Sequence, residues 1–270
     1  MAVEINLDEL VLLAAGREAE IYALDAGRVL RLAFSGSQRD VVDREALVLE
    51  TAREAGVPVP AVHGRVTVAG RPGLIVDRLD GRDLLTRLEH EPWLVWSAAR
   101  TLGLVHARFH QVPAPSDLPT VREQLEVQLQ SPLVPEDVRG RALRQLEALP
   151  DGDALCHCDF HPANLLRGGH DYVVIDCGHG ARGDAGSDVA RTHLLLRHSA
   201  LPEGTAAVMR TLTKVGRGII VSGYMRAYSR ATRVPLPTIA PWTPVHAAAR
   251  LAEGIEVERS TMLALARSST

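Results

Sequence analysis

Four side chains in one stretch of the chain have residue types and a spacing that suit metal and phosphate chemistry. His157, Asp159 and Asn164 lie within "HCDFHPAN", and Asp176 ends the apolar segment "YVVID" that follows. A loop and the end of the next strand can bring a carboxylate, an amide oxygen and a second carboxylate together. Such oxygen ligands suit Mg²⁺, which leaves room for substrate phosphates. A carboxylate beside the ion can accept a proton from an attacking hydroxyl, as phosphoryl transfer needs.

The segments that precede this stretch predict a small sheet with one inserted helix. Residues Glu18–Leu24 and Arg28–Phe34 alternate on either side of a turn at Asp25–Gly27, which predicts a hairpin. Residues Asp40–Gly56 change to helical spacing and end at a glycine. Residues Gly64–Gly81 predict a second hairpin. The first part of the chain is therefore expected to be a small antiparallel sheet.

The pattern from Arg82 onward is mainly helical. One long apolar-periodic segment is Glu91–Val112, and Trp93 and Trp96 within it, like Trp242, are expected in the core or lining a pocket. With a boundary near Gly81, the chain is predicted to form an N-terminal lobe at 1–80 and a larger C-terminal lobe at 81–270. The predicted fold class is therefore α+β with two lobes, a sheet with one helix followed by a mainly helical lobe.

Composition excludes several classes of protein. The chain has 270 residues, 46% of them hydrophobic, and a formal net charge of -3, so it has no basic surface that would predict nucleic acid or anionic membranes as partners. No apolar run is long enough to span a membrane, and the acidic N-terminus does not resemble a signal peptide. Three cysteines argue against a disulfide framework. We therefore expect a cytoplasmic protein.

The stretch that contains Asp159, Asn164 and Asp176 resembles the corresponding segment of one known family. "HCDFHPANLL" followed by "VVIDCGHG" is similar to the catalytic loop and metal-binding segment of the aminoglycoside-phosphotransferase-like family. That family has the pattern H-x-D-x-x-x-x-N before a strand that ends in Asp, and it shares the bilobal protein-kinase-like fold. The resemblance implies a small-molecule kinase. Its phosphoryl donor would be ATP (or GTP), its metal Mg²⁺, and its acceptor a hydroxyl of an antibiotic, a sugar or an amino alcohol.

The resemblance assigns a role to each residue of the catalytic segment. Asp159 is expected to orient the acceptor hydroxyl and take its proton, while Asn164 and Asp176 are expected to bind the metal. His157 would support the loop. "RGDAGSDVAR" resembles the family's segment after the metal-binding Asp, so Asp188 would support the catalytic lobe, or it would only cap a helix.

The resemblance also implies a nucleotide site in the first lobe. "AAGREAEIYAL" looks like the nucleotide-binding loop, with Gly16 at its turn, and Glu45 stands where the family has a helix acid. "GLIVDRLDG" looks like the last strand and the hinge. Backbone groups around Asp77 and Leu79 in that hinge are expected to bind adenine.

One position departs from the family pattern. The third strand of the family carries a lysine that binds the α- and β-phosphates and pairs with the helix acid, and here Arg31 stands at that position. Glu45 is therefore expected to pair with Arg31, or it is an ordinary solvated acid of the helix. The chain has a single lysine, Lys214, far along the other lobe. Arginine keeps the positive charge but is a wide planar fork. Either Arg31 takes over the role, which the almost exclusive use of arginine favours, or the chain is a nucleotide-binding pseudokinase of low activity.

Two further alternatives are weaker. A zinc site is conceivable from the cysteines and histidines near the motif, although their spacing is not usual for zinc ligands; these are Cys156, His157, Cys158, His161 and Cys177. A protein kinase would need an activation segment ending in A-P-E after Asp176, and none is present.

The acceptor pocket is expected in the C-terminal helices, where carboxylates that could bind a polycationic aminoglycoside are few. They are Glu203, Glu253, Glu256 and Glu258. This scarcity disfavours an aminoglycoside as the acceptor.

Overall fold

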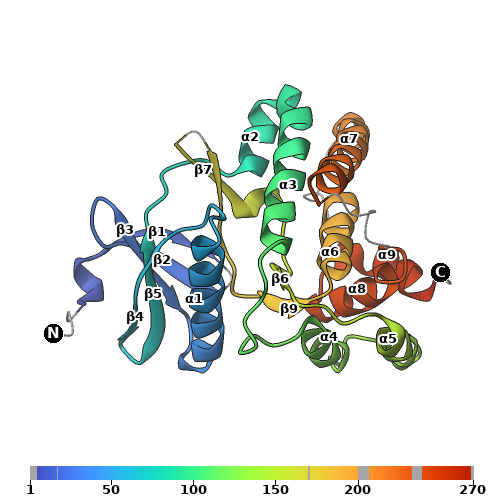
Figure 1. Ribbon diagram of the computed structural model, residues 1–270, viewed down its shortest axis with the longest axis horizontal. Coiled ribbons are helices and arrows are strands. Elements are labelled where there is room, and N and C mark those ends of the chain that lie inside the picture. The colour runs from blue at the N-terminus through green and yellow to red at the C-terminus, as the bar shows by residue number, and fades with distance from the viewer. Residues whose placement is uncertain (1–4, 17, 170, 200–206, 233–238, 269–270) are drawn as a thin grey trace. The chain divides into compact units, whose positions relative to one another are not determined.

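The computed structural model divides into two compact units (Figure 1). Unit 1 comprises Met1–Leu84 and Ala163–Gly180, and unit 2 comprises Leu85–Pro162 and Ala181–Thr270. Residues 163–180 thus belong with the N-terminal segment, while the functional division into lobes at 1–80 and 81–270 stays a prediction. The structure describes residues 5–16, 18–169, 171–199, 207–232 and 239–268.

Unit 1 is built on an antiparallel sheet of five strands in the order β1-β2-β3-β5-β4. The strands are β1 Val11–Ala15, β2 Ala19–Ala23, β3 Arg28–Ala33, β4 Val62–Val68 and β5 Arg71–Asp77. Both predicted hairpins are present, as β2–β3 and β4–β5. The edge strand β1 was not predicted, because "VLLAA" shows no alternation and its residues are all exposed.

One helix, α1 at Arg39–Glu54, contacts strands β4 and β5 (Figure 1). Its apolar spacing buries Ala46, Val48 and Leu49. Strand β3 pairs with both β2 and β5. The predicted small antiparallel sheet with one helix is therefore confirmed.

A further hairpin completes unit 1. Strands β7 (Leu165–Gly168) and β8 (Asp171–Val174) pair with each other, and Val174 N–H donates to the carbonyl of Pro58 at 2.8 Å. Gly81 passes so close to this hairpin that an added Cβ would lie 1.7 Å from the carbonyl oxygen of Arg167. Only glycine fits there, because any side chain would displace the hairpin backbone.

Unit 2 is mainly helical, as predicted. Its short strands β6 (Ala154–Cys156) and β9 (Ala181–Gly183) form an antiparallel pair. Its helices are α3 Val95–His110, α4 Val121–Leu129, α5 Glu136–Ala148, α6 Ala185–His198, α7 Ala207–Thr232, α8 Thr243–Arg250 and α9 Glu256–Arg267, and α2 (Leu84–His90) begins at the boundary between the units. Among the residues described, no helix combines the length and the apolar character needed to cross a membrane.

Helices α3 and α7 lie side by side in unit 2 (Figure 1). Glycines permit the close approach, because an added Cβ on Gly103 would lie 2.5 Å from the carbonyl oxygen of Tyr224. The expected core position of Trp93 and Trp96 was wrong, since they are 70% and 64% exposed, while their lining of a pocket stays a prediction. The buried face of α3 consists mostly of small and aliphatic side chains that permit close packing, and the two tryptophans do not lie on it.

Candidate active site

In unit 1, Arg31 connects two acidic side chains. Leu30 and Leu32 on either side of it are fully buried, and strand alternation places Arg31 on the opposite face of the sheet from them. Its Nη1 lies 2.6 Å from Glu45 Oε2 on α1, and its Nη2 donates to Asp176 Oδ1 at 2.9 Å. The guanidinium fork uses one nitrogen for each carboxylate, which a single ammonium group cannot reproduce in the same way.

Burial and charge set the protonation of this group. Burial raises the pKa of Glu45 to about 7, against the opposing effect of Arg31. Burial acts to lower the pKa of Arg31, but Glu45, Asp176 and Glu18 together raise it above its ordinary value. Arg31 is therefore a fixed positive charge, and Glu45 changes its charge near neutral pH.

Asn164 and Asp176 are held next to each other by the β7–β8 hairpin. Asn164 precedes β7, and its carbonyl oxygen accepts a hydrogen bond of 3.0 Å from the N–H of Ile175. The residue after Ile175 is Asp176, which has a left-handed backbone with φ of 60° and a side chain that is 43% exposed. An amide oxygen and a partly exposed carboxylate on adjacent chain segments are the donor set that Mg²⁺ prefers. The residues therefore fit the expected metal.

The loop between β1 and β2 carries Gly16. Its N–H donates to the carbonyl of Ala19 at 2.9 Å, so the chain turns tightly at this point. Glu18, in the same loop, lies 3.2 Å from His179 Nε2, and His179 follows Asp176 closely in the sequence. The loop is thus linked by a side-chain contact to the segment that contains Asp176.

At the end of β5, Asp77 is engaged in local structure. Its N–H donates to the carbonyl of Ala61 at 3.1 Å, and its carboxylate accepts from Ala61 N–H and contacts His63 Nε2 at 2.9 and 2.7 Å. These bonds connect β5 to the start of β4. The expected adenine contacts at Asp77 and Leu79 stay predictions, and they would have to use backbone groups other than the Asp77 N–H.

In unit 2, Asp159 lies among three polar groups. Arg191 Nη2 donates to its Oδ1 at 3.3 Å, His161 Nε2 lies 3.4 Å from its Oδ2, and its backbone N–H donates to His157 Nδ1 at 3.3 Å. Burial acts to raise the pKa of Asp159, but His161 and Arg191 hold it well below its usual range. The carboxylate is therefore ionised at neutral pH and can accept a proton.

Asp188 anchors the loop that carries Asp159. Its Oδ2 accepts from the backbone N–H of His157 at 2.6 Å, and its Oδ1 accepts from that of Cys158 at 3.0 Å. Helix α6 has Asp184 at its N-cap position, without a side-chain cap bond, so Asp188 does not cap this helix. The fully buried His157 packs near Phe109 and Phe160, with ring centroids 5.7 Å away.

Two histidines of α3 complete the surroundings of Asp188. His106 and His110 place Nε2 at 3.1 and 3.2 Å from its Oδ2, and their Nδ1 atoms are hydrogen bonded to the hydroxyls of Tyr224 and Tyr228. Burial and the nearby His110 lower the pKa of His106 to about 4, so this ring is neutral. The histidines, with their own partners, hold the pKa of Asp188 well below its usual range against the effect of burial.

The zinc alternative does not match the side-chain positions in the described part of the chain. There, the group of side chains close enough to share one ion is His106, His110 and Asp188, which includes none of the residues of that alternative. Each ring nitrogen of these two histidines already has a hydrogen-bond partner. We interpret the group as a hydrogen-bond network.

The chain also matches a known protein family over most of its length. The sequence model of the phosphotransferase enzyme family (APH) matches residues 9–220, which is well over half of the chain. The chain belongs to this family. The resemblance stated from the motifs is thereby confirmed, and a search of curated proteins gives no significant match to this phosphotransferase-family chain.

Solved structures show the same fold. A type VIII aminoglycoside-3'-phosphotransferase is 19% identical, with a TM-score of 0.66 over 91% of this chain and 92% of that one. A choline/ethanolamine kinase family protein from Mesorhizobium loti is 17% identical, with a TM-score of 0.63 over 96% and 88%. An amicoumacin kinase in complex with AMP-PNP, Ca2+ and Ami is 17% identical, with a TM-score of 0.63 over 97% and 88%. The kinase-like fold of this phosphotransferase-family protein is thus confirmed.

The structure shows polar contacts that sequence reasoning about this phosphotransferase-family chain had missed. Arg191 contacts Asp159, and the histidines His106 and His110 contact Asp188. The spacing of the two histidines, four residues apart within an apolar helix, was a signal that they share one face. Arg191 gave no such signal, because its partner is distant in the sequence.

Proposed function

We propose that this protein is a small-molecule kinase that transfers the γ-phosphoryl group of ATP or GTP to a hydroxyl of a small acceptor. The observation that carries the proposal is the Asp159 carboxylate in contact with Arg191, on a loop that Asp188 anchors through two backbone N–H groups. Structural neighbours support a nucleotide donor, since one was solved with AMP-PNP and another with GDP and kanamycin. An antibiotic, a sugar or an amino alcohol is the acceptor class that we propose.

Unit 1 would bind the donor. Arg31 supplies a permanent positive charge for the phosphates, and Glu45 holds one side of its fork. The loop at Gly16 would cover the phosphates, and the backbone near Asp77 and Leu79 would bind the base. The contacts of Arg31 favour an active kinase over a pseudokinase. The arginine pairs with Glu45, as the usual lysine of the family would be expected to do.

The metal expected by resemblance would bind to Asn164 and Asp176. When bound, Mg²⁺ would neutralise negative charge on the donor phosphates. Asp176 already contacts Arg31 at 2.9 Å, so this carboxylate would serve the ion and the arginine together. The β7–β8 hairpin holds the chain segments of Asn164 and Asp176 next to each other.

Asp159 would act on the acceptor. Its carboxylate accepts the proton of the acceptor hydroxyl while the hydroxyl oxygen forms a bond to the γ-phosphorus. The bond between that phosphorus and the bridging oxygen of the donor breaks, and the nucleoside diphosphate leaves. The products are the phosphorylated acceptor and the diphosphate, with the proton on Asp159 until solvent removes it.

The test is a turnover assay with magnesium and ATP or GTP against a panel of hydroxyl compounds. Asp159→Asn should lower kcat by about 100- to 10,000-fold and leave nucleotide binding nearly unchanged. The matched control is Asp117→Asn, which changes an exposed aspartate of the same unit. Equal turnover of Asp159→Asn and wild-type protein would remove Asp159 from this role. Nucleotide binding by the wild-type protein without transfer to any acceptor would favour the pseudokinase.

A further inference from the structure

Arg191 on α6 bridges two carboxylates in unit 2. The same nitrogen, Nη2, lies 3.3 Å from Asp159 Oδ1 and 2.8 Å from Glu253 Oε1. The Arg191 side chain is 12% exposed. Glu253 belongs to the short turn between α8 and α9. One guanidinium nitrogen thus connects the proposed proton acceptor to a separate part of the helical unit.

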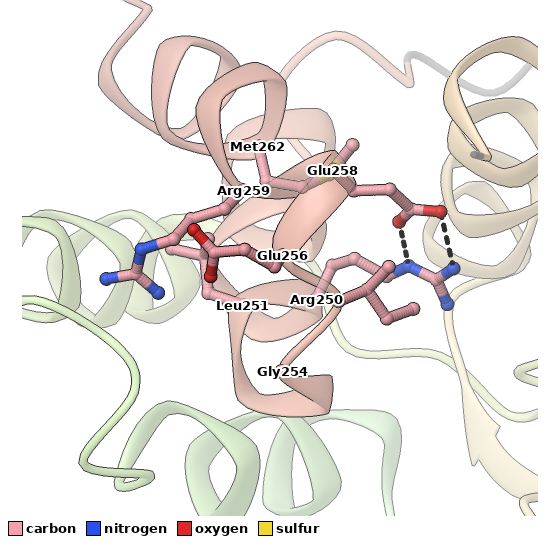
Figure 2. Close-up of a pocket in the computed structure, with 8 residues that line it drawn as sticks. Arg250, Leu251, Gly254, Glu256, Glu258, Arg259 and Met262 are labelled. Carbon is pink, nitrogen blue, oxygen red and sulfur yellow. Dashed lines mark hydrogen bonds and ion pairs between the residues drawn. The ribbon is translucent and has the colours of Figure 1, made fainter. Parts of the chain in front are cut away.

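The row of charges continues beyond Glu253. Arg250 Nη1 lies 2.6 Å from Glu253 Oε2, and Arg250 contacts both carboxylate oxygens of Glu258, at 2.8 and 3.2 Å. Figure 2 shows the Arg250 guanidinium facing the Glu258 carboxylate. Arg250 and Glu258 are 11% and 4% exposed. Acidic and basic groups alternate at every step, so each charge has an opposite neighbour.

This row of charges restricts the position of the Arg191 side chain. An isolated arginine at the surface loses side-chain entropy when it pairs, and the pair contributes little. Here Arg191 is mostly buried, and its second partner, Glu253, contacts Arg250, which in turn forms a bidentate pair with Glu258. The entropic cost of ordering Arg191 is therefore shared among several contacts. The guanidinium therefore has a defined position from which to hold the Asp159 carboxylate.

The pocket beside this row of charges is too small to bind an acceptor. Residues that line it include Arg250, Gly254, Glu258 and Met262 (Figure 2). Its volume of about 10 Å³ has room for about one water molecule. Within this region the Arg250–Glu258 pair is connected to Arg191 through Glu253, which contacts both arginines.

We propose that Arg191 is a positioning residue for Asp159, and that Glu253 and the Arg250–Glu258 pair fix Arg191 in place. This inference rests on the proposed function of Asp159. Arg191 holds Oδ1 of the carboxylate, and Oδ2, which lies 3.4 Å from His161 Nε2, would accept the proton of the acceptor hydroxyl. The groups that face Asp159 are Arg191, His161 and His157, and together they keep it ionised.

The test uses kinetics and a titration of Asp159 itself. Arg191→Gln should lower kcat about 10- to 100-fold and change the KM for nucleotide less than about 3-fold, since it removes an orienting contact and no nucleotide contact. Arg191→Lys should recover part of kcat, because it keeps the charge but not the fork. Arg267→Gln, which breaks the exposed pair with Asp137, is the matched control.

A ¹³C NMR titration of the Asp159 carboxyl separates positioning from simple stabilisation. Arg191→Gln should move its titration upward toward the ordinary value of about 3.9, whereas Arg267→Gln should not. Glu253→Gln, which keeps Arg191, provides a milder variant and should lower kcat about 3- to 10-fold. Wild-type kcat in Arg191→Gln, or an unchanged Asp159 titration, would overturn the inference. If the wild-type protein phosphorylates nothing, the proposed function fails, while the titration still tests the pairing of Arg191 with Asp159.

Discussion

Arg31 and Asp176 are joined by a hydrogen bond of 2.9 Å, although they are far apart in the sequence of unit 1. The same guanidinium lies 2.6 Å from Glu45, so one side chain is shared by two acids. The arginine that departs from the family pattern thus makes the acid contact expected of the usual lysine.

This shared contact predicts that arginine and lysine differ at this position. Arg31→Lys should weaken binding of magnesium nucleotide about 10-fold, because one ammonium replaces a fork that uses two nitrogens. Arg31→Gln should weaken it further, since no positive charge is left. Isothermal titration calorimetry measures both. Arg65→Gln, which breaks the exposed bidentate pair with Glu50, is the control, and nucleotide binding by Arg31→Gln at wild-type affinity would contradict the prediction.

Glu45 predicts a pH dependence of stability. Its pKa is raised from 4.5 to about 7 in the folded protein, so the folded state holds the proton more firmly than the unfolded chain. The resulting stabilisation is fully present below pH 4.5 and is lost as the pH rises through about 7.

Urea unfolding of wild-type protein and Glu45→Gln at pH 6 and pH 8 checks this sign. The difference in free energy of unfolding, wild type minus variant, should be more favourable at pH 6 by about 1 kcal/mol. Glu50→Gln, which changes an exposed acid on the same helix, should show no such change between the two pH values. A difference of the opposite sign would mean that Arg31 outweighs burial at Glu45.

Because Asp188 is buried and accepts several hydrogen bonds, we expect its removal to lower the stability of the protein strongly. Asp188→Ala removes the acceptor of two loop N–H groups and two histidines, and it should lower the free energy of unfolding by about 3–5 kcal/mol. Asp137→Ala breaks an exposed ion pair with Arg267 and should cost less than about 1 kcal/mol. Urea denaturation of both variants, monitored by circular dichroism, gives the comparison. Equal losses would show that the network around Asp188 contributes no more than a surface pair.

The charge row in unit 2 predicts the kind of acceptor. Two of the four carboxylates named from the sequence as candidates for a polycation, Glu253 and Glu258, are paired with arginines. Glu256 is exposed on α9, and Glu203 lies outside the described residues, so at most a few carboxylates would face an acceptor here. Neutral sugars should therefore show higher kcat/KM than aminosugars that carry several ammonium groups. Parallel turnover assays with acceptors matched in hydroxyl number make the comparison. A consistent preference for the polycations would show that other carboxylates form the acceptor site.

The residues nearest to one another in sequence were predicted most fully. The spacing of His157, Asp159 and Asn164 is local, so the motif places them on one loop without knowledge of the fold. Arg31 was identified because, on a predicted strand, it stands where the family carries a lysine. The fold class also followed, because the change from alternating to helical periodicity is a property of the sequence itself.

Contacts between distant segments could not be predicted in this way. Arg191 binds Asp159 because α6 and the loop are brought together by packing, and no spacing in the sequence encodes that approach. The exposure of Trp93 and Trp96 has the same origin, since helical periodicity defines a face but not which face is covered.

The return of residues 163–180 to unit 1 has a consequence for biosynthesis. While a ribosome has delivered only the first 84 residues, the carbonyls of Pro58 and Arg82 lack the donors that Val174 and Arg167 later provide. The five-stranded sheet can form from these residues, but unit 1 stays incomplete until nearly two thirds of the polypeptide has emerged. A truncated product that stops at Leu84 would expose these backbone acceptors to chaperones and proteases.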